Sequence, residues 1–235
     1  MNTKSWITIV LAVMLLLLPL SLNAEENPRD HLPQEKTHTA VSFSIPTGTW
    51  LAFTEKRQHE SELVNAFDAI QAHDFDAAQH DLELTESFLK IEEGRATPRA
   101  LETLKAARAS LKQLRKELKS GNVGSLDSVR TLFAQVDYTL ARHNLLLAEK
   151  EIDSEEPANS GYDLLHYVKD LKAACDWATV EVNPADQGDL DDLETIGGQL
   201  RVGESYDPAH LTASFATGEK ILGHYASTLS PPWIE

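Results

Sequence analysis

Histidines with carboxylates one helical turn away are the residues of this chain whose types and spacing could do chemistry. His80 follows Asp76 by four positions and precedes Glu83 by three, so a helix would place both carboxylates beside its imidazole. Imidazole nitrogens and carboxylate oxygens are ligands that divalent transition metals accept. His143 interrupts an otherwise apolar stripe, where it would be a metal ligand, a proton switch or a core histidine with one hydrogen bond. The candidate metal ligands are therefore His143, His80, Asp76 and Glu83.

Named catalytic and cofactor motifs are missing from the sequence. The predicted bundle helices hold no Glu-x-x-His pair for a di-iron centre, and the chain has no Cys-x-x-Cys-His, Gly-x-Ser-x-Gly or His-Glu-x-x-His. Cys175 is nine positions from His166, which puts the two side chains on opposite faces of one helix. Gly188 and Glu194 fit two places of a calcium loop, but Ala185 stands where an oxygen ligand is required. We therefore predict no catalytic residue and, as cofactor, at most a divalent transition metal.

The N-terminus has the three parts of a secretory leader. Lys4 supplies the positive start, an apolar run extends from Trp6 to Leu18, and Pro19 precedes a cleavage site after Ala24. The alternative is an uncleaved anchor, but the run reaches only 17 residues when it is extended to Leu22, which is borderline for crossing a bilayer. We expect cleavage and export, with the protein periplasmic or secreted and without a membrane span once the leader is removed.

The formal net charge of −16 becomes −17 when Lys4 leaves with the leader. Such a charge repels nucleic acid and anionic lipid, whereas basic proteins and metal cations remain compatible partners. Cys175 is the only cysteine, so the chain cannot form an internal disulfide, and we expect this thiol to be buried or joined to another chain. The expected partner is an unidentified protein or a second copy of this chain.

The longest helical signal runs from Ser125 to Glu151. Its inward positions, spaced by three and four residues, are Val129, Phe133, Val136, Leu140, His143 and Leu147. Ser125 can cap the first turn. At about 1.5 Å per residue the segment spans roughly 40 Å, which suits the centre of a bundle. The other helices are expected to pack around it.

Periodicity, caps and breakers predict further helices on both sides of this segment. Their approximate ranges are 54–72, 75–94, 98–119, 161–178, 189–200 and 208–229. Thr97 and Gly121 bracket the helix 98–119, whose first residue is a proline. Asn183 and Pro184 are expected to end a helix, and Asp189 to cap the next one. Gly197, Gly198 and Gly203 are expected in a loop.

Charge distinguishes the two helices between residues 74 and 119. Residues 74–93 carry a net charge of −6 and residues 95–119 a net charge of +6, so antiparallel packing would match them electrostatically. The alternative is that the basic strip recruits an acidic partner. The turn at 73–78 is similar to the turn inside tetratricopeptide-type helical hairpins, a likeness confined to one hairpin because no repeat recurs at a fixed period.

The sequence thus predicts an all-α protein, an antiparallel bundle of about four helices followed by a smaller unit of two to three. The predicted divisions are a leader at 1–24, an extended or disordered arm at 25–49, the bundle at 50–152, a linker at 153–160 and the second unit at 161–235. Trp177 and Trp233 are expected to seat the second unit on the first. The leading hypothesis is a non-enzymatic interaction or stress-related protein of the cell envelope. The alternatives are a metal-sequestering bundle and a carrier of an apolar ligand.

Overall fold

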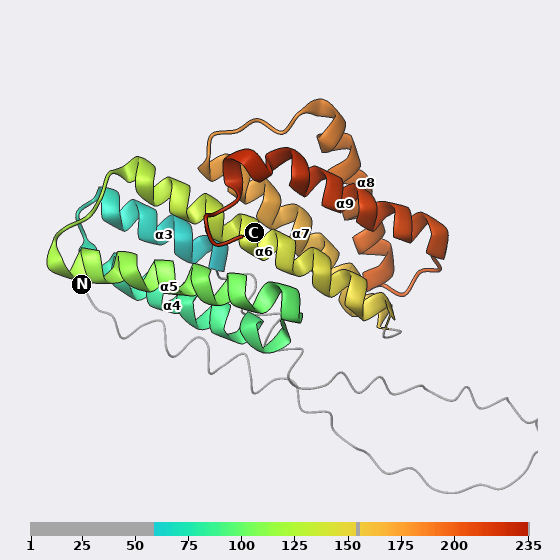
Figure 1. Ribbon diagram of the computed structural model, residues 1–235, viewed down its shortest axis with the longest axis horizontal. Coiled ribbons are helices and arrows are strands. Elements are labelled where there is room, and N and C mark those ends of the chain that lie inside the picture. The colour runs from blue at the N-terminus through green and yellow to red at the C-terminus, as the bar shows by residue number, and fades with distance from the viewer. Residues whose placement is uncertain (1–58, 154–155, 235) are drawn as a thin grey trace, which may run out of the picture. The chain divides into compact units, whose positions relative to one another are not determined.

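The computed structural model describes residues 59–153 and 156–234 (Figure 1). Within these ranges the chain forms a helical bundle without any strand, which confirms the all-α prediction. The helices are α3 (His59–Gln71), α4 (Phe75–Arg95), α5 (Pro98–Ser120), α6 (Leu126–Asp153), α7 (Pro157–Trp177), α8 (Pro184–Arg201) and α9 (Pro208–Leu229). The predicted leader, the arm and the first residues of the predicted bundle lie outside the described residues.

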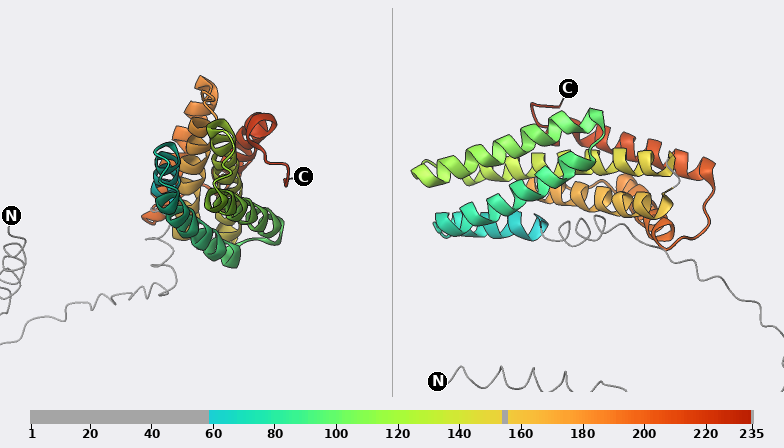
Figure 2. Two further views of the ribbon diagram at one scale, coloured as in Figure 1. Left: turned by 90° about the vertical axis from the view of Figure 1, so that its left-hand side faces the viewer. Right: turned by 90° about the horizontal axis from the view of Figure 1, so that it is seen from below.

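Helix α6 separates two apolar cores. Its positions Val129, Phe133, Val136 and Leu140 join α3, α4 and α5 in a cluster that we call the first core. The positions Ala134, Tyr138, Ala141, Leu145 and Ala148 join α7, α8 and α9 in the second core. Figure 2 shows α3 and α9 on different sides of α6, as this division requires. Every inward position predicted for α6 is buried, so this helix is central as expected. The division at 153–160 stays a prediction.

The α4–α5 hairpin confirms the electrostatic match expected from its charge blocks. Arg108 Nε donates to Glu93 Oε1 at 2.6 Å, and Arg115 Nε donates to Glu86 Oε1 at 2.9 Å. The two helices pack side by side. Helix α4 itself is capped by Asp74, whose side chain accepts a hydrogen bond from the amide of Ala77. Opposite charges on adjacent helices therefore face each other across the rim of the first core.

Proline marks the helix starts in the second half of the chain. Helix α7 begins at Pro157, four residues before the predicted start, because proline is favoured at a first helical position. Helix α8 begins at Pro184, and Asn183 caps it by accepting from the amides of Ala185 and Asp186. The prediction that Asn183 and Pro184 end a helix, with Asp189 as the next cap, was wrong, because these two residues are the cap and the first residue of α8.

Two glycines allow α7 and α8 to approach closely. A Cβ atom on Gly161 would lie 2.5 Å from the carbonyl oxygen of Gly197 and 2.6 Å from the amide nitrogen of Arg201. Gly197 and Gly198 were predicted in a loop but lie inside α8. Because only glycine lacks the side chain that would block this contact, Gly161 and Gly197 set the distance between the two helices.

Trp177 joins the two cores at the end of α7. Its ring packs edge-on against Phe67 and Phe133, with centroids 5.3 Å and 5.2 Å away. Trp233 also packs against the first core, in agreement with the predicted seating role of both tryptophans. Cys175 is buried as a thiol. None of the helices in the described ranges has an apolar stretch sufficient to cross a membrane.

Candidate functional site

Polar residues recur every seven positions along α6 and α7. They are Asp137, Asn144 and Glu151 on α6, and Asp163 and Asp170 on α7. At about 100° per residue the α6 positions form one stripe, which lies between the helix's two apolar faces. In the antiparallel pair Asn144 Nδ2 donates to Asp170 Oδ2 at 2.6 Å, and both side chains are buried. A polar seam therefore runs between α6 and α7, along the boundary of the two cores.

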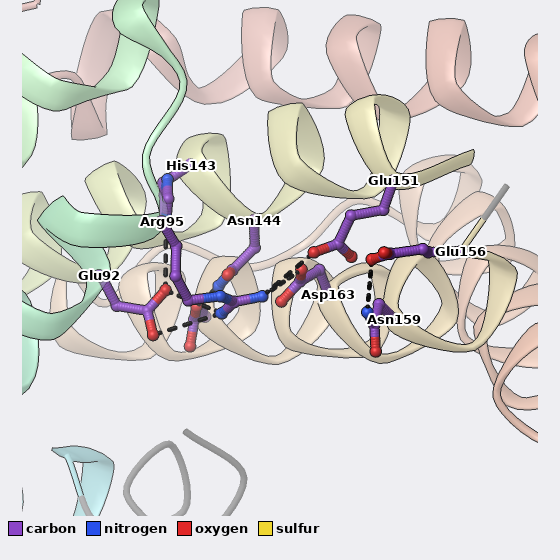
Figure 3. A network of polar contacts seen from close by, with 9 residues as sticks. Glu92, Arg95, His143, Asn144, Glu151, Glu156, Asn159 and Asp163 are labelled. Carbon is purple, nitrogen blue, oxygen red and sulfur yellow. Dashed lines mark hydrogen bonds and ion pairs between the residues drawn. The ribbon is translucent and has the colours of Figure 1, made fainter. Parts of the chain in front are cut away.

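Arg95 closes one end of this seam from the last turn of α4 (Figure 3). Its Nη2 donates to Asp163 Oδ2 at 2.8 Å and to Glu151 Oε1 at 3.4 Å, while Nη1 donates to Glu92 Oε2 at 3.1 Å. Burial opposes the charge of Arg95, but the carboxylates of Asp163, Glu92 and Glu151 outweigh it and raise the pKa of the guanidinium. Arg95 is therefore a permanent cation that ties α4, α6 and α7 together.

His143 reaches the same network from α6. Its Nε2 lies 3.0 Å from Glu92 Oε2, and both side chains are completely buried. Because Arg95 also donates to this carboxylate, Glu92 is the acceptor and the His143 Nε2–H is the donor. General acid–base catalysis requires a reacting atom within hydrogen-bond reach of the acid or base. A pair without exposed surface instead holds α4 against α6.

The other predicted metal ligands lie on the exposed side of α4. His80, Asp76 and Glu83 are all exposed, and Glu83 Oε2 is 3.5 Å from Arg115 Nη1. The structure does not bring His143 to them, since its partner is Glu92. In the part of the chain that the structure describes, no three His, Cys, Asp or Glu side chains are arranged to hold one metal ion. Metal binding by these residues stays a prediction.

A second polar cluster joins α8 to α9. His224 Nδ1 lies 3.0 Å from Asp186 Oδ1, the Asn183 side-chain amide also donates to Asp186, and the amide of Asn183 donates to the Tyr225 hydroxyl at 3.1 Å. Burial alone would raise the pKa of Asp186, but hydrogen bonds from His224, Tyr225 and Asn183 lower it. Asp186 therefore remains a carboxylate that anchors α9 on the first turn of α8.

Sequence reasoning missed both clusters. Asp163 had no predicted role, and Arg95 was predicted only as a member of the basic block at 95–119. The seven-residue spacing on α6 and α7 was a usable signal, because polar residues at that spacing share a face. His224 had no such signal, since Asp186 lies 38 positions away.

An open cleft lies where the polar seam meets Trp177. Its volume is about 410 Å³, and its lining combines apolar side chains with both signs of charge: Val64, Phe67, Arg130, Asp137, Ala173, Asp176, Trp177 and Thr179. Val64 is 48% exposed, and the Arg130 guanidinium lies 5.1 Å above the Phe67 ring. The cleft is large enough for a side chain or small ligand and offers an aromatic floor with carboxylates near it.

The chain matches no protein-family model, no curated protein and no solved structure.

Proposed function

We propose that this protein is an exported helical-bundle protein that binds a partner protein and catalyses no reaction. The leader-like residues from Lys4 to Ala24 support export. The observation that carries the binding role is the position of the open cleft between α3, α6 and α7. Its accessible lining is aromatic and aliphatic with a few charges, the composition of a binding pocket. The His143–Glu92 pair, in contrast, is completely buried.

The chemistry of the cleft favours a basic partner. Asp137 and Asp176 line it together with Arg130, and the Phe67 ring already accepts a guanidinium on its face. An aromatic floor of this kind suits an arginine or lysine whose apolar stem packs on the rings. The net charge, −16 for the full chain and −17 without Lys4, also attracts positively charged proteins at long range. The partner is thus expected to insert an apolar side chain that lies next to a basic residue.

Photo-crosslinking in the producing cell tests this proposal. A photoreactive phenylalanine analogue replaces Val64 at the cleft, and the matched control replaces Val202, which is 65% exposed on another helix end. We expect an adduct of one defined mass from position 64 and none from position 202. Asp176→Lys, a change of an exposed residue at the cleft, should reduce the yield several-fold because it repels a basic partner.

Each alternative has a distinct outcome in this experiment. Equal adducts from both positions, or a yield unaffected by Asp176→Lys, would contradict binding in the cleft. An adduct with the mass of a lipid would instead identify an apolar-ligand carrier, and an adduct of twice the chain mass would identify a second copy as the partner. A turnover by the purified protein that a point substitution abolishes would overturn the non-enzymatic proposal.

A further inference from the structure

A small cavity with two arginines lies at the junction of α5, α6 and α9, away from the polar seam. Its volume is about 100 Å³, and its lining comprises Arg99, Tyr138, Arg142, Leu145, Leu146, Glu219 and Leu222. At roughly 30 Å³ per water molecule, the cavity has room for about three waters. It can thus admit an ion or the end of a larger molecule, but not an entire drug-sized ligand.

The charges around this cavity are unbalanced. Glu219 is the one acidic residue among the described residues of the lining. Its Oε1 is 3.7 Å from Arg99 Nη1, in a pair whose side chains are both more than half exposed. Such exposed pairs contribute little. Arg142 forms no hydrogen bond and no ion pair with any residue in the described ranges. Arg142 is partly buried, and its guanidinium has five N–H donors to satisfy.

The two arginines also oppose each other. Burial lowers the pKa of Arg142, and the positive charge of Arg99 lowers it further, against smaller contributions from Tyr138 and Glu219. Helix α5 adds to the positive potential, because Arg99 lies in its first turn, where no acidic residue compensates the helix dipole. A bound anion would accept hydrogen bonds from the Arg142 guanidinium and would reduce the repulsion between the two arginines.

The surrounding contacts hold the cavity in shape. The Tyr138 hydroxyl donates to the carbonyl oxygen of Leu222 at 3.0 Å, which fixes α6 against α9. Leu145, two turns after Tyr138 on α6, packs closely against Gly218 of α9. A Cβ atom on Gly218 would lie 3.0 Å from the Leu145 Cδ1. Arg142 is therefore presented by a rigid part of the second core rather than by a loop.

We infer that this cavity binds a phosphoryl group, the doubly charged oxyanion held between the guanidinium groups of Arg99 and Arg142. Guanidinium groups match phosphate oxygens in geometry and form strong charge-assisted hydrogen bonds with them. The group can belong to inorganic phosphate or to a phosphomonoester whose remainder stays outside, since the shared chemistry is the phosphoryl group alone. This site is independent of the cleft at Trp177 and does not rest on partner binding there.

The test is a ³¹P NMR titration of the purified protein at constant ionic strength, once with inorganic phosphate and once with glycerol phosphate. We expect saturable binding of both. Arg142→Gln should weaken binding at least about tenfold and Arg99→Gln severalfold, because Arg142 is the more buried donor. Glu219→Gln should strengthen binding, since it removes a competing carboxylate. Arg201→Gln is the matched control, with the same change of charge at an exposed site on α8.

Several outcomes would overturn the inference. No saturable binding of either compound, or equal affinities in Arg142→Gln and Arg201→Gln, would show that the arginines hold no phosphoryl group. Binding of glycerol phosphate alone would place recognition outside the cavity. Circular dichroism separates misfolding from lost binding, and Arg142→Gln has a second signature. It should leave the anion-free protein as stable as before or more stable, because the repulsion with Arg99 disappears.

Discussion

The first and second cores differ in how polar residues contribute to them. Among the described residues of α3, α4 and α5, the buried polar ones are Thr85 and Glu92, and the ion pairs between α4 and α5 lie at the rim of the first core. Helices α7, α8 and α9 bury more polar residues, namely Ser160, Asp163, His166, Asp170, Asp186 and Ser214. Ion pairs at the rim favour one neighbouring helix over another but contribute little to the free energy of folding. The loss of one partner of a buried polar contact, in contrast, is strongly destabilising. The two halves of the molecule thus use charge for different purposes.

Replacement of one arginine at the buried polar seam and one at the rim tests this difference between buried and rim charges. Arg95→Met deprives the buried carboxylates of Glu92 and Asp163 of their shared cation, and we expect a loss of about 3 kcal/mol in the free energy of unfolding. Arg115→Met, which breaks the rim pair with Glu86, should cost at most about 1 kcal/mol. Urea unfolding followed by circular dichroism measures both.

Equal losses of unfolding free energy in the two variants would contradict the distinction between buried and rim charges. The double variant Arg95→Met with Asp163→Asn tests whether the loss comes from the direct contact between these two residues. When the carboxylate is neutralised together with its cation, the loss should be smaller than the sum of the two single changes, because the two residues interact directly.

The same difference explains which parts of the fold could be predicted from the sequence. Helix α5 was predicted to within a residue, because Pro98 and Gly121 are local signals and its inward stripe is uniformly apolar. Thr97 stands at the predicted N-cap position, but its side chain forms no capping hydrogen bond. Gly121 indeed adopts a positive φ of 72°. The match between α4 and α5 was also predictable, since opposite blocks of charge are adjacent in the sequence.

The second core could be predicted only in part. Leu164, Val168 and Leu171 were correctly placed inward on α7, but Asp163 and Asp170 share that buried side. An aspartate is normally exposed, so its burial depends on a partner that local patterns do not identify. Arg95 is 68 positions from Asp163, which is why the polar seam was not anticipated. His143 was recognised as unusual, but Glu92 was not foreseen as its partner.

Glycine substitutions test the close helix contact in the second core. Gly161→Ala would place a Cβ against the backbone of α8, and we expect a loss of about 2 kcal/mol in unfolding free energy from the forced separation. Gly198→Ala is the matched control inside α8, where a Cβ meets nothing within 4 Å. It should stabilise the helix by up to about 1 kcal/mol.

Thermal or urea unfolding of these two variants separates their effects by sign. A stabilising Gly161→Ala would mean that α7 and α8 have room between them, and it would remove the reason given for glycine at this crossing. A destabilising Gly198→Ala would show that this position, although open to a Cβ, is not an ordinary helical site.

Acid unfolding tests the buried carboxylate at the start of α8. Because the pKa of Asp186 is lowered below its ordinary value of 3.8, the unfolded chain binds this proton more readily than the folded protein does. The stabilisation is therefore complete above about pH 4 and is lost as the pH falls through the lowered pKa. Asp186→Asn should cost about 1.5 kcal/mol at pH 7 and flatten the acid limb of the stability curve.

The matched control for Asp186 is Asp192→Asn, an exposed residue of the same helix. It should change neither the stability at pH 7 nor the acid limb. If Asp186→Asn leaves the pH dependence below 4 unchanged, the cluster with His224 and Tyr225 does not hold α8 to α9 through this charge.

The smallest expected effect belongs to the rim of the first core. Glu86→Arg or Arg115→Glu alone places like charges opposite each other on α4 and α5, and each should cost less than about 1 kcal/mol in unfolding free energy. The double variant restores an opposite pair in reversed order, and a double-mutant cycle should recover most of the loss. Such recovery would show that the rim uses charge only to match neighbours. If the double variant instead loses as much unfolding free energy as the two single variants together, the reversed pair does not form. The rim pair would then depend on the exact geometry of its side chains, as the contacts of Arg95 do, and burial would be the one remaining difference between rim and seam charges.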